Sequence, residues 1–310
     1  MTTRATWLSS CGAAALAASA PQIVRAQTRP LIHVGCGNIE SHAEAYYARA
    51  NGFFTQNGID VDIQNLRNGA AIASAVAGGD LQIGVSSILQ LAAGRGAGLP
   101  FIVIAPGGLH DGKAAHTANL VVAAGSPITK PAELNGKIIA VNTLNGLDQI
   151  IADALIDKNG GDSRTVKYVE VPPAAAADAV VLGRVSAAQL EEPELSGAGD
   201  RVRRLGDGED AIGPRFATTG WFTTDDWLAK NKDVARRFAA AIFAAGAWAM
   251  QNPDRAGAVL HDALGLTQAR GTQTFATGRD PRELSPLLAT AVKYKVAVPV
   301  TTSQLFWDGK

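Results

Sequence analysis

The chain has 310 residues, of which 47 % are hydrophobic and 18 % charged, a composition that can bury a large core and excludes global disorder. Its 28 basic and 28 acidic side chains leave no formal net charge, which argues against nucleic acid as a partner because nucleic acid attracts a basic surface. Two cysteines cannot supply a disulfide framework or a four-thiolate metal site, and the length favours two lobes over one core, since single cores stop growing at about 250–300 residues.

The first 26 residues have the pattern of a secretory signal peptide. Arg4 and Arg25 flank an apolar run, Cys11–Ala20, and no acidic residue is present. Val24-Arg25-Ala26 fits the small-x-small cleavage rule, and the apolar run is shorter than the about 20 residues that a membrane span needs. We therefore expect cleavage after Ala26 and export to the periplasm. A frayed N-terminal helix of a cytosolic protein is the alternative.

Short apolar strands alternate with helices in the next part of the chain. Strands are expected over residues 31–35, 59–63, 81–85 and 101–105, and helices over residues 41–51, 70–77 and 86–93. Glycines end several of these elements, as Gly52 and Gly78-Gly79 do for the first two helices. Strands and helices that alternate over short loops are typical of a parallel sheet covered on both faces.

A second, similar series of elements starts at residue 119. Strands are expected over residues 119–123, 137–141, 166–171 and 185–190, and helices over residues 147–158 and 174–182. Residues 72–85 and 177–190 both show a helix, a glycine stop, a short strand and a polar tip, which we interpret as a structural repeat. Chance similarity in a Gly- and Ala-rich chain is the alternative. An apolar segment over 216–222 and a mostly helical region from Asp225 complete the chain.

The sequence lacks the common motifs of catalytic and metal chemistry. It contains no phosphate-binding loop, no His-Glu-x-x-His, no paired Cys-x-x-Cys and no Gly-x-Ser-x-Gly elbow. The 5 histidines are scattered, and His110 and His116 are expected in a solvated loop. Cys36, the one cysteine left after signal cleavage, is expected to be a small buried hydrophobe. Catalysis has no positive support, and we expect no metal and no cofactor.

Polar residues at the ends of the expected strands favour binding instead. In open parallel sheets, ligands lie beyond the carboxyl ends of the strands, where helix N-termini present backbone N–H groups. The candidate tips are residues 36–38, 86–87, 106–108, 142–146 and 191–192. Ser86 and Ser87 are each explained equally well as a helix N-cap, but two tips that face each other across two lobes favour a site. Glu191 and Glu192 favour a donor group on the ligand, and Arg67 is expected to be a surface charge.

Four segments in register resemble one protein family. Residues 45–62 lead from a helix through Gly-Phe-Phe to Gly-Ile-Asp-Val, and further matches lie at residues 79–87, 131–142 and 183–193. With this order and spacing, the chain is similar to the periplasmic solute-binding proteins of ABC importers of the nitrate/sulfonate/taurine type, which include thiamine-pyrimidine-precursor-binding relatives. It departs from the family pattern at Ser186, where Asp is common, and at Ile88, where several sulfonate binders carry an acidic residue.

The resemblance implies an α/β, two-lobed periplasmic binding protein-like fold of type II, in which each lobe is a mainly parallel sheet flanked by helices. Residues 27–116 and 226–310 would form lobe 1 and residues 117–225 lobe 2, with crossings near 114–117 and 222–226. It implies a periplasmic protein, not an enzyme, that captures a small polar organic solute (a sulfonate, carboxylate or heterocycle) in an interlobe cleft and delivers it to the membrane permease of an ABC importer. We expect a monomer.

The family pattern also implies which residues contact the solute. They lie at the strand tips of both lobes and beside the second crossing: Asn38, His42, Ser86, Ser87, Asn142, Thr143, Asn145, Gly146, Glu192 and Trp221. Trp221 would cover the solute, with a buried packing aromatic as the alternative. The alternative function is an enzyme on the same scaffold, similar to a thiamine-pyrimidine synthase or another small-molecule lyase, although the Cys-rich run of that synthase is missing from this sequence.

Overall fold

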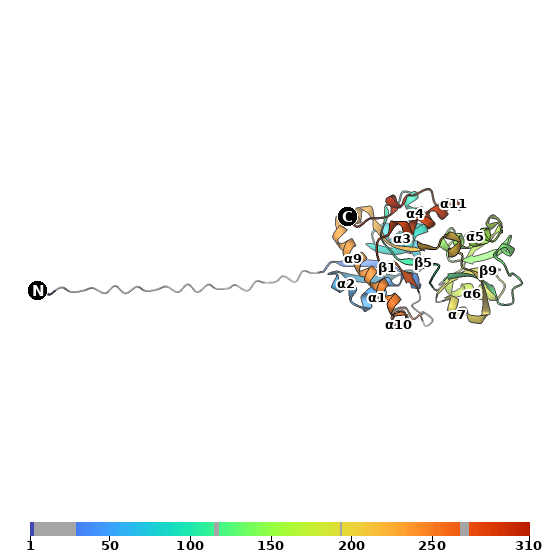
Figure 1. Ribbon diagram of the computed structural model, residues 1–310, viewed down its shortest axis with the longest axis horizontal. Coiled ribbons are helices and arrows are strands. Elements are labelled where there is room, and N and C mark those ends of the chain that lie inside the picture. The colour runs from blue at the N-terminus through green and yellow to red at the C-terminus, as the bar shows by residue number, and fades with distance from the viewer. Residues whose placement is uncertain (3–28, 115–117, 193, 267–272) are drawn as a thin grey trace.

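The helices and strands of the computed structural model form two α/β lobes that lie side by side (Figure 1). The structure describes residues 1–2, 29–114, 118–192, 194–266 and 273–310. Residues 3–26 of the expected signal peptide and residues 115–117 of the first expected crossing lie outside these ranges.

The first lobe is built on a five-stranded sheet in the order β2-β1-β3-β12-β4. Its strands are β1 (Leu31–Cys36), β2 (Asp60–Asn65), β3 (Ile83–Ser87), β4 (Phe101–Pro106) and β12 (Thr219–Thr224). β1 is parallel to both β2 and β3, whereas β12 lies antiparallel between β3 and β4. Because β12 follows the second lobe in the sequence, the first sheet is completed only after the chain returns.

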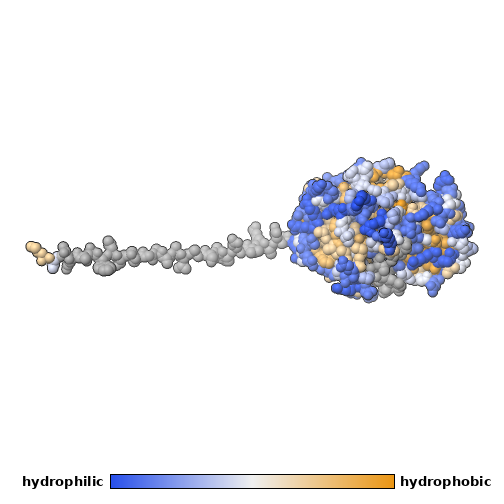
Figure 2. All heavy atoms as spheres, in the orientation of Figure 1, coloured by the Kyte–Doolittle hydropathy of each residue, from blue (hydrophilic) through white to orange (hydrophobic). Residues whose placement is uncertain are grey.

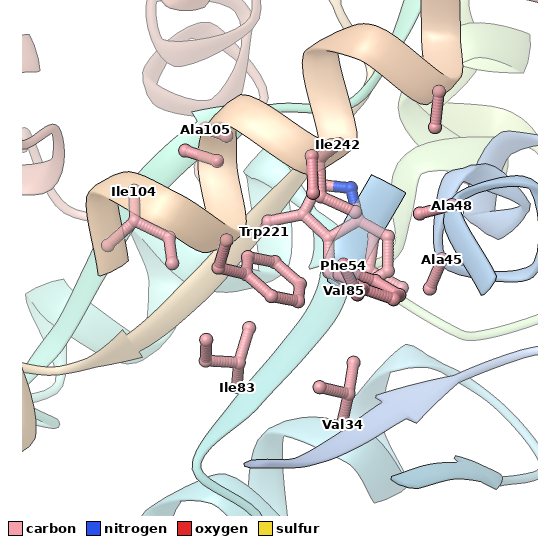
Figure 3. Packing of buried hydrophobic residues seen from close by; sticks show 14 of the residues in the cluster. Val34, Ala45, Ala48, Phe54, Ile83, Val85, Ile104, Ala105, Trp221 and Ile242 are labelled. Atoms are coloured by element: carbon pink, nitrogen blue, oxygen red, sulfur yellow. The ribbon is translucent and has the colours of Figure 1, made fainter. Parts of the chain in front are cut away.

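Helices cover both faces of this sheet. One face carries α1 (Glu44–Ala50), α2 (Phe53–Gln56), α9 (Asp225–Gln251) and α10 (Pro253–Leu264), and the other carries α3 (Gly69–Gly78), α4 (Ile88–Gly96), α11 (Ser285–Lys293) and α12 (Thr302–Leu305). Neighbouring strand residues point to opposite faces, so Trp221 and Phe222 of β12 belong to different core clusters. Figure 3 shows Trp221 packed among Phe54, Val85 and Ile242 on the first face.

The second lobe is built on a five-stranded sheet in the order β10-β6-β9-β7-β8. Its strands are β6 (Ala118–Ala123), β7 (Ile138–Val141), β8 (Lys167–Glu170), β9 (Ala187–Glu191) and β10 (Val202–Gly206). β7 is parallel to β8 and β9, and β6 is antiparallel to β9 and β10. α5 (Leu147–Lys158) packs on one face, with α8 (Glu209–Ile212) beside it, and α6 (Pro173–Val181) and α7 (Glu194–Ala198) pack on the other.

A small third sheet joins the two crossings between the lobes. β5 (Gly108–Asp111) precedes the second lobe and β11 (Arg215–Ala217) follows it, and the two strands pair antiparallel, with β13 (Thr274–Phe275) on the other side of β5. Arg215 donates to Asp111 at 2.6 Å and to Glu283 at 3.1 Å. Two lobes on a short double connection have the arrangement in which hinge closure around a ligand occurs.

The predicted α/β fold is confirmed, and the strand pairing adds detail to it. Each sheet is mainly parallel, as predicted, and is mixed only because one strand, β12 or β6, runs opposite to the other four. β12 and β6 run antiparallel because they enter their sheets from the other lobe, not through a strand-helix-strand crossover. The return crossing is earlier than predicted: Thr219–Thr224 pairs within the first sheet, so the chain crosses back before Thr219 and not near 222–226.

Short 3₁₀ helices complete the fold: η1 (Glu40–His42), η2 (Pro131–Leu134), η3 (Ser163–Thr165), η4 (Gly199–Arg201) and η5 (Pro281–Leu284). Within the described ranges, none of the helices combines the length and the apolar character that crossing a membrane requires. On the face that Figure 2 shows, hydrophilic residues are spread over both lobes.

Candidate ligand-binding cleft

A cavity lies between the two lobes, where strands of both sheets end. Its empty volume is about 800 Å³, part of which is open to solvent. The first lobe lines it with Ile39, Ser41, His42, Gly69, Ser87, Gln90 and Thr219. The second lobe lines it with Asn142, Thr143, Gly146, Leu147, Asp148, Val171, Pro173, Ala176, Gln189, Leu190, Glu191 and Glu194.

His42 gives the first lobe a neutral imidazole in the cleft wall. It ends the η1 turn after β1, and its Nδ1 accepts a hydrogen bond from the Gly37 backbone N–H at 3.1 Å. A Cβ at position 37 would lie 2.8 Å from Nδ1, so this contact needs glycine. The accepting role of Nδ1 assigns the ring proton to Nε2. Burial lowers the pKa of His42 to about 4, so the ring is uncharged at neutral pH.

The start of α4 supplies hydroxyl and amide groups. Ser87 caps the helix, and its Oγ accepts the Gln90 backbone N–H at 3.2 Å. Ser86, fully buried behind the cleft wall, donates through Oγ to Gln90 Oε1 at 2.7 Å. This bond occupies the amide oxygen of Gln90 and directs its NH₂ group to other acceptors. Gly69 makes room for the pair, because a Cβ there would lie 2.6 Å from both side-chain oxygens.

The loop between β7 and α5 forms the rim of the second lobe. Asp148, in the first turn of α5, accepts the Asn142 backbone N–H through Oδ2 at 3.0 Å. Gly146 is the residue before α5, and a Cβ there would lie 2.7 Å from the Thr143 carbonyl oxygen. The tight turn therefore holds the polar side chains of Asn142 and Thr143 near the N-terminus of α5, where backbone N–H groups lack partners within the helix.

Acidic side chains dominate the second-lobe wall. Burial raises the pKa of Asp148 to about 6. Burial, followed by the negative charge of Asp148, raises the pKa of Glu191 well above its usual range. Burial also raises the pKa of Glu194, with contributions from the charge of Glu192 and, across the cleft, from Glu40. Among the described residues that line the cleft, there is no lysine or arginine.

Five of the ten residues predicted from the sequence line the cleft: His42, Ser87, Asn142, Thr143 and Gly146. The other five do not. Asn38 is exposed and its Oδ1 accepts a hydrogen bond from Asn65 Nδ2. Ser86 lies behind the wall and acts on the cleft only through Gln90. Asn145 is exposed, with φ 55°, outside the cavity.

Glu192 and Trp221, the two remaining predicted residues, have structural contacts instead. The Glu192 carboxylate accepts the backbone N–H of Ser196 at 3.0 Å and its Oγ–H at 2.8 Å, and so caps α7. Trp221 is fully buried in the first-lobe core, with its ring centroid 5.4 Å from that of Phe238. This position matches the alternative interpretation of Trp221 as a packing aromatic.

Gln189 is a cleft residue that the sequence analysis missed, and Glu191, named there as part of a strand tip, was left out of the ten solute contacts in favour of its neighbour Glu192. Side chains alternate along a strand, so Gln189 and Glu191 share the face of β9 that packs toward α5 with Ala187. Gln189 is 5 % exposed, and neither Nε2 nor Oε1 has a hydrogen-bond partner among the described residues. The period of two in the sequence was the signal that could have found them.

His110 is buried, which corrects the expectation of a solvated loop. It is 5 % exposed because β5 pairs with β11, and its ring packs on Phe216 at 5.3 Å between centroids. Nδ1 lies 3.2 Å from Glu209 and Nε2 lies 3.0 Å from Asp210. Burial acts to lower the pKa of His110, but the hydrogen bond and charge of Glu209 outweigh it and raise the pKa. One side-chain atom each of His110, Asp207 and Glu209 lie within 4.8 Å of one another, so β5 meets the segment before β11 in a cluster of ionisable groups.

Comparisons with known proteins agree with this geometry. The model of the NMT1/THI5 like family matches residues 39–256. The taurine-binding periplasmic protein of Escherichia coli (strain K12) is 30 % identical over 207 residues, which cover 66 % of this chain and 62 % of that protein. The match therefore spans less than two thirds of the length of that relative.

Two solved structures show the same fold. The periplasmic aliphatic sulphonate binding protein SsuA from Escherichia coli superposes with a TM-score of 0.71 at 19 % identity, over 90 % of this chain and 92 % of that one. The periplasmic nitrate-binding protein NrtA from Synechocystis PCC 6803 superposes with a TM-score of 0.70 at 12 % identity, over 88 % of this chain and 83 % of that one. The chain thus has the periplasmic binding protein fold and belongs to the NMT1/THI5 like family.

Proposed function

We propose that the protein is an extracytoplasmic solute-binding protein, which captures a small polar organic solute in the interlobe cleft and delivers it to the permease of an ABC importer. The observation that supports this best is the cleft, which both lobes line with polar groups at the ends of their strands. The names of the relatives support a sulfonate, carboxylate or heterocycle as the solute and the periplasm as the location.

Capture requires that the solute contact both lobes. The first lobe offers Ser87 and Gln90, and the second lobe offers Asn142 and Thr143. A solute that bonds to both walls has more affinity for the closed arrangement than for the open one, so it shifts the protein toward closure. The paired strands β5 and β11 are the connection about which the lobes move. The closed, loaded form then presents the permease with a surface that the empty form lacks.

We propose binding rather than catalysis. The enzyme alternative, similar to a thiamine-pyrimidine synthase, would use a lysine that carries pyridoxal phosphate. The described residues that line the cleft include no lysine, which favours the binding role. The absorbance spectrum of the purified protein tests this point, because a stoichiometric cofactor band would contradict it.

Thermal unfolding and solution scattering with a panel of sulfonates, carboxylates and pyrimidines test the function. We expect at least one solute to raise the unfolding midpoint and to reduce the radius of gyration. Ser87→Ala combined with Thr143→Ala, one change in each lobe, should weaken binding of that solute about tenfold or more, since each hydrogen bond contributes about 0.5–1.5 kcal/mol.

The matched control combines Ser74→Ala with Thr55→Ala, two exposed helical residues outside the cleft. This control should bind the solute as the wild type does. Unfolding midpoints without solute account for the loss of the α4 cap. Wild-type affinity in the cleft variant, or a panel in which no solute changes the midpoint or the radius, would contradict the proposed function.

A further inference from the structure

The cleft offers a solute three carboxyl groups and, among the described lining residues, no basic side chain. We propose that the solute carries a protonated nitrogen, as an ammonium, amidinium, guanidinium or protonated aminoheterocycle does, and that the second lobe holds this group between Asp148 and Glu191, beside Gln189. The inference rests on the proposed function and narrows the class of solute that the cleft takes. It differs from the expectation that the names of the sulphonate- and nitrate-binding relatives suggest.

The charges on the cleft wall all have one sign. Asp148, Glu191 and Glu194 line the second lobe, and the described lining residues include no basic side chain that offsets them. The charged groups that act on Glu191 are Asp148, Glu209 and Glu194, all acidic. His42, on the opposite wall, is buried and uncharged at neutral pH. A cation between these carboxyl groups would stabilise their ionised forms, which burial and their mutual repulsion otherwise disfavour.

Gln189 is an independent sign of a missing partner. Its side chain is 5 % exposed and lines the cleft, yet neither Nε2 nor Oε1 has a hydrogen-bond partner among the described residues. A buried amide without partners is unfavourable, and native proteins rarely leave one unsatisfied. An ammonium has three N–H donors, enough for Asp148, Glu191 and the Gln189 carbonyl oxygen together. Gln189 and Glu191 lie on one face of β9, so both face the same part of the cleft.

Asp148 is already positioned for such a contact. Its Oδ2 accepts the Asn142 backbone N–H at 3.0 Å, which fixes the carboxyl group and leaves Oδ1 for a solute. It also lies in the first turn of α5, where the helix dipole favours negative charge. Fixed carboxylates bind protonated nitrogens through short, charge-assisted hydrogen bonds. The neutral polar groups of Ser87 and Gln90 on the first lobe would then bind the rest of the solute.

A solute that carries negative charge and no protonated nitrogen would bind this cleft poorly. It would be desolvated beside Asp148 and Glu191 with no basic side chain among the described lining residues to pair with, and each of these carboxyl groups would repel it when ionised. An aminosulfonate fits the cleft only with its ammonium group on the second lobe. We therefore expect the cleft to bind aminated solutes more tightly than simple anions of the same size.

Matched pairs of small probes measure this preference directly. Taurine carries an ammonium group where isethionate carries a hydroxyl group, and the two are otherwise alike. Methylguanidinium and methanesulfonate are small ions of opposite charge. Titrations of the isotope-labelled protein, followed by amide chemical shifts, should place methylguanidinium at residues 142–148 and 189–191, with taurine at least about tenfold tighter than isethionate. Isethionate that binds as tightly as taurine, or the absence of a cleft response to methylguanidinium, would overturn the proposal.

Single substitutions test whether Asp148 and Glu191 hold the protonated nitrogen. Asp148→Asn and Glu191→Gln should each weaken methylguanidinium binding about tenfold or more. Asp153→Asn is the matched control. Asp153 is a buried acid of α5, and burial also raises its pKa to about 6. It lies outside the cleft, where it accepts a hydrogen bond from the Tyr168 hydroxyl at 2.6 Å. This control variant should bind the probe as the wild type does. Equal losses in all three variants would attribute the effect to the fold and overturn the proposal.

The outcomes also separate this inference from the proposed function. A purely anionic solute that shifts the cleft amides and contracts the protein would refute the charge assignment but leave the solute-binding function standing. Probes that bind outside the cleft, with no change at residues 142–148 or 189–191, would refute both.

Discussion

Replacing Glu44 by Gln is expected to stabilise the protein above neutral pH. Glu44 lies on α1 and is 1 % exposed, and neither carboxyl oxygen has a partner with good hydrogen-bond geometry among the described residues. The Trp221 indole Nε1 is unpartnered in the same way, and a Cβ on neighbouring Gly107 would lie 3.1 Å from Glu44 Oε1. Burial raises the pKa of Glu44 to about 8, which outweighs the smaller opposing effects of its own backbone N–H and the indole.

The size and sign of the effect follow from the two pKa values. Between the usual 4.5 and the folded value of about 8, the folded protein keeps a proton that the unfolded chain releases, so stability falls as pH rises through this window. At about 1.36 kcal/mol for each pH unit, the loss is about 3 kcal/mol at pH 7 and about 5 kcal/mol above pH 8. Gln is neutral at every pH and should remove this loss.

Urea unfolding at about pH 5, 7 and 9 measures the prediction. The stability of Glu44→Gln relative to the wild type should increase steadily across this range. Glu170→Gln, a change at an exposed position, should follow the wild type at every pH. A Glu44→Gln protein that is less stable than the wild type at about pH 9, or a difference that does not grow with pH, would refute the reasoning.

Three further predictions concern the cleft. Because burial lowers the pKa of His42 from 6.5 to about 4, its neutral ring should contribute about 3 kcal/mol that is lost as pH falls through this window, and urea unfolding of His42→Gln should show no such loss. Glu191→Ala should weaken solute binding about tenfold at unchanged helix capping, whereas Glu192→Ala should keep the affinity and lose about 1 kcal/mol of stability with the α7 cap, as calorimetric titration and thermal unfolding would show. Gly69→Ala should displace the Gln90 amide and lower solute affinity several-fold; unchanged affinity would exclude Gln90 from the site.

Local sequence signals predicted most helices and strands but not how distant strands pair. The helix over Leu147–Lys158 was predicted with its observed bounds, because its apolar spacing is regular and glycines flank it. β5 and β10 were missed, since His110 and the pair Arg203-Arg204 interrupt any apolar pattern there. The insertion of β12 between β3 and β4 depends on contacts between segments far apart in the chain, which no local pattern contains.

The candidate site was predictable where the residue before a helix closes the turn from a strand, as Ser87 does before α4 and Gly146 before α5. The choice between Glu191 and Glu192 failed because β9 ends between them: Glu191 lies on the strand face that meets the cleft, whereas the Glu192 carboxylate is held by Ser196 at the start of α7. Trp221 could not be placed from sequence, since its burial depends on the same long-range insertion of β12.

Amide hydrogen exchange tests most directly whether both lobes hold one solute. It is measured with and without the solute of the panel that raises the unfolding midpoint most. The account predicts slower exchange in both cleft walls at once, at residues 86–90 of the first lobe and at residues 142–148 and 189–192 of the second. Slower exchange confined to one lobe, or located away from these segments, would contradict it.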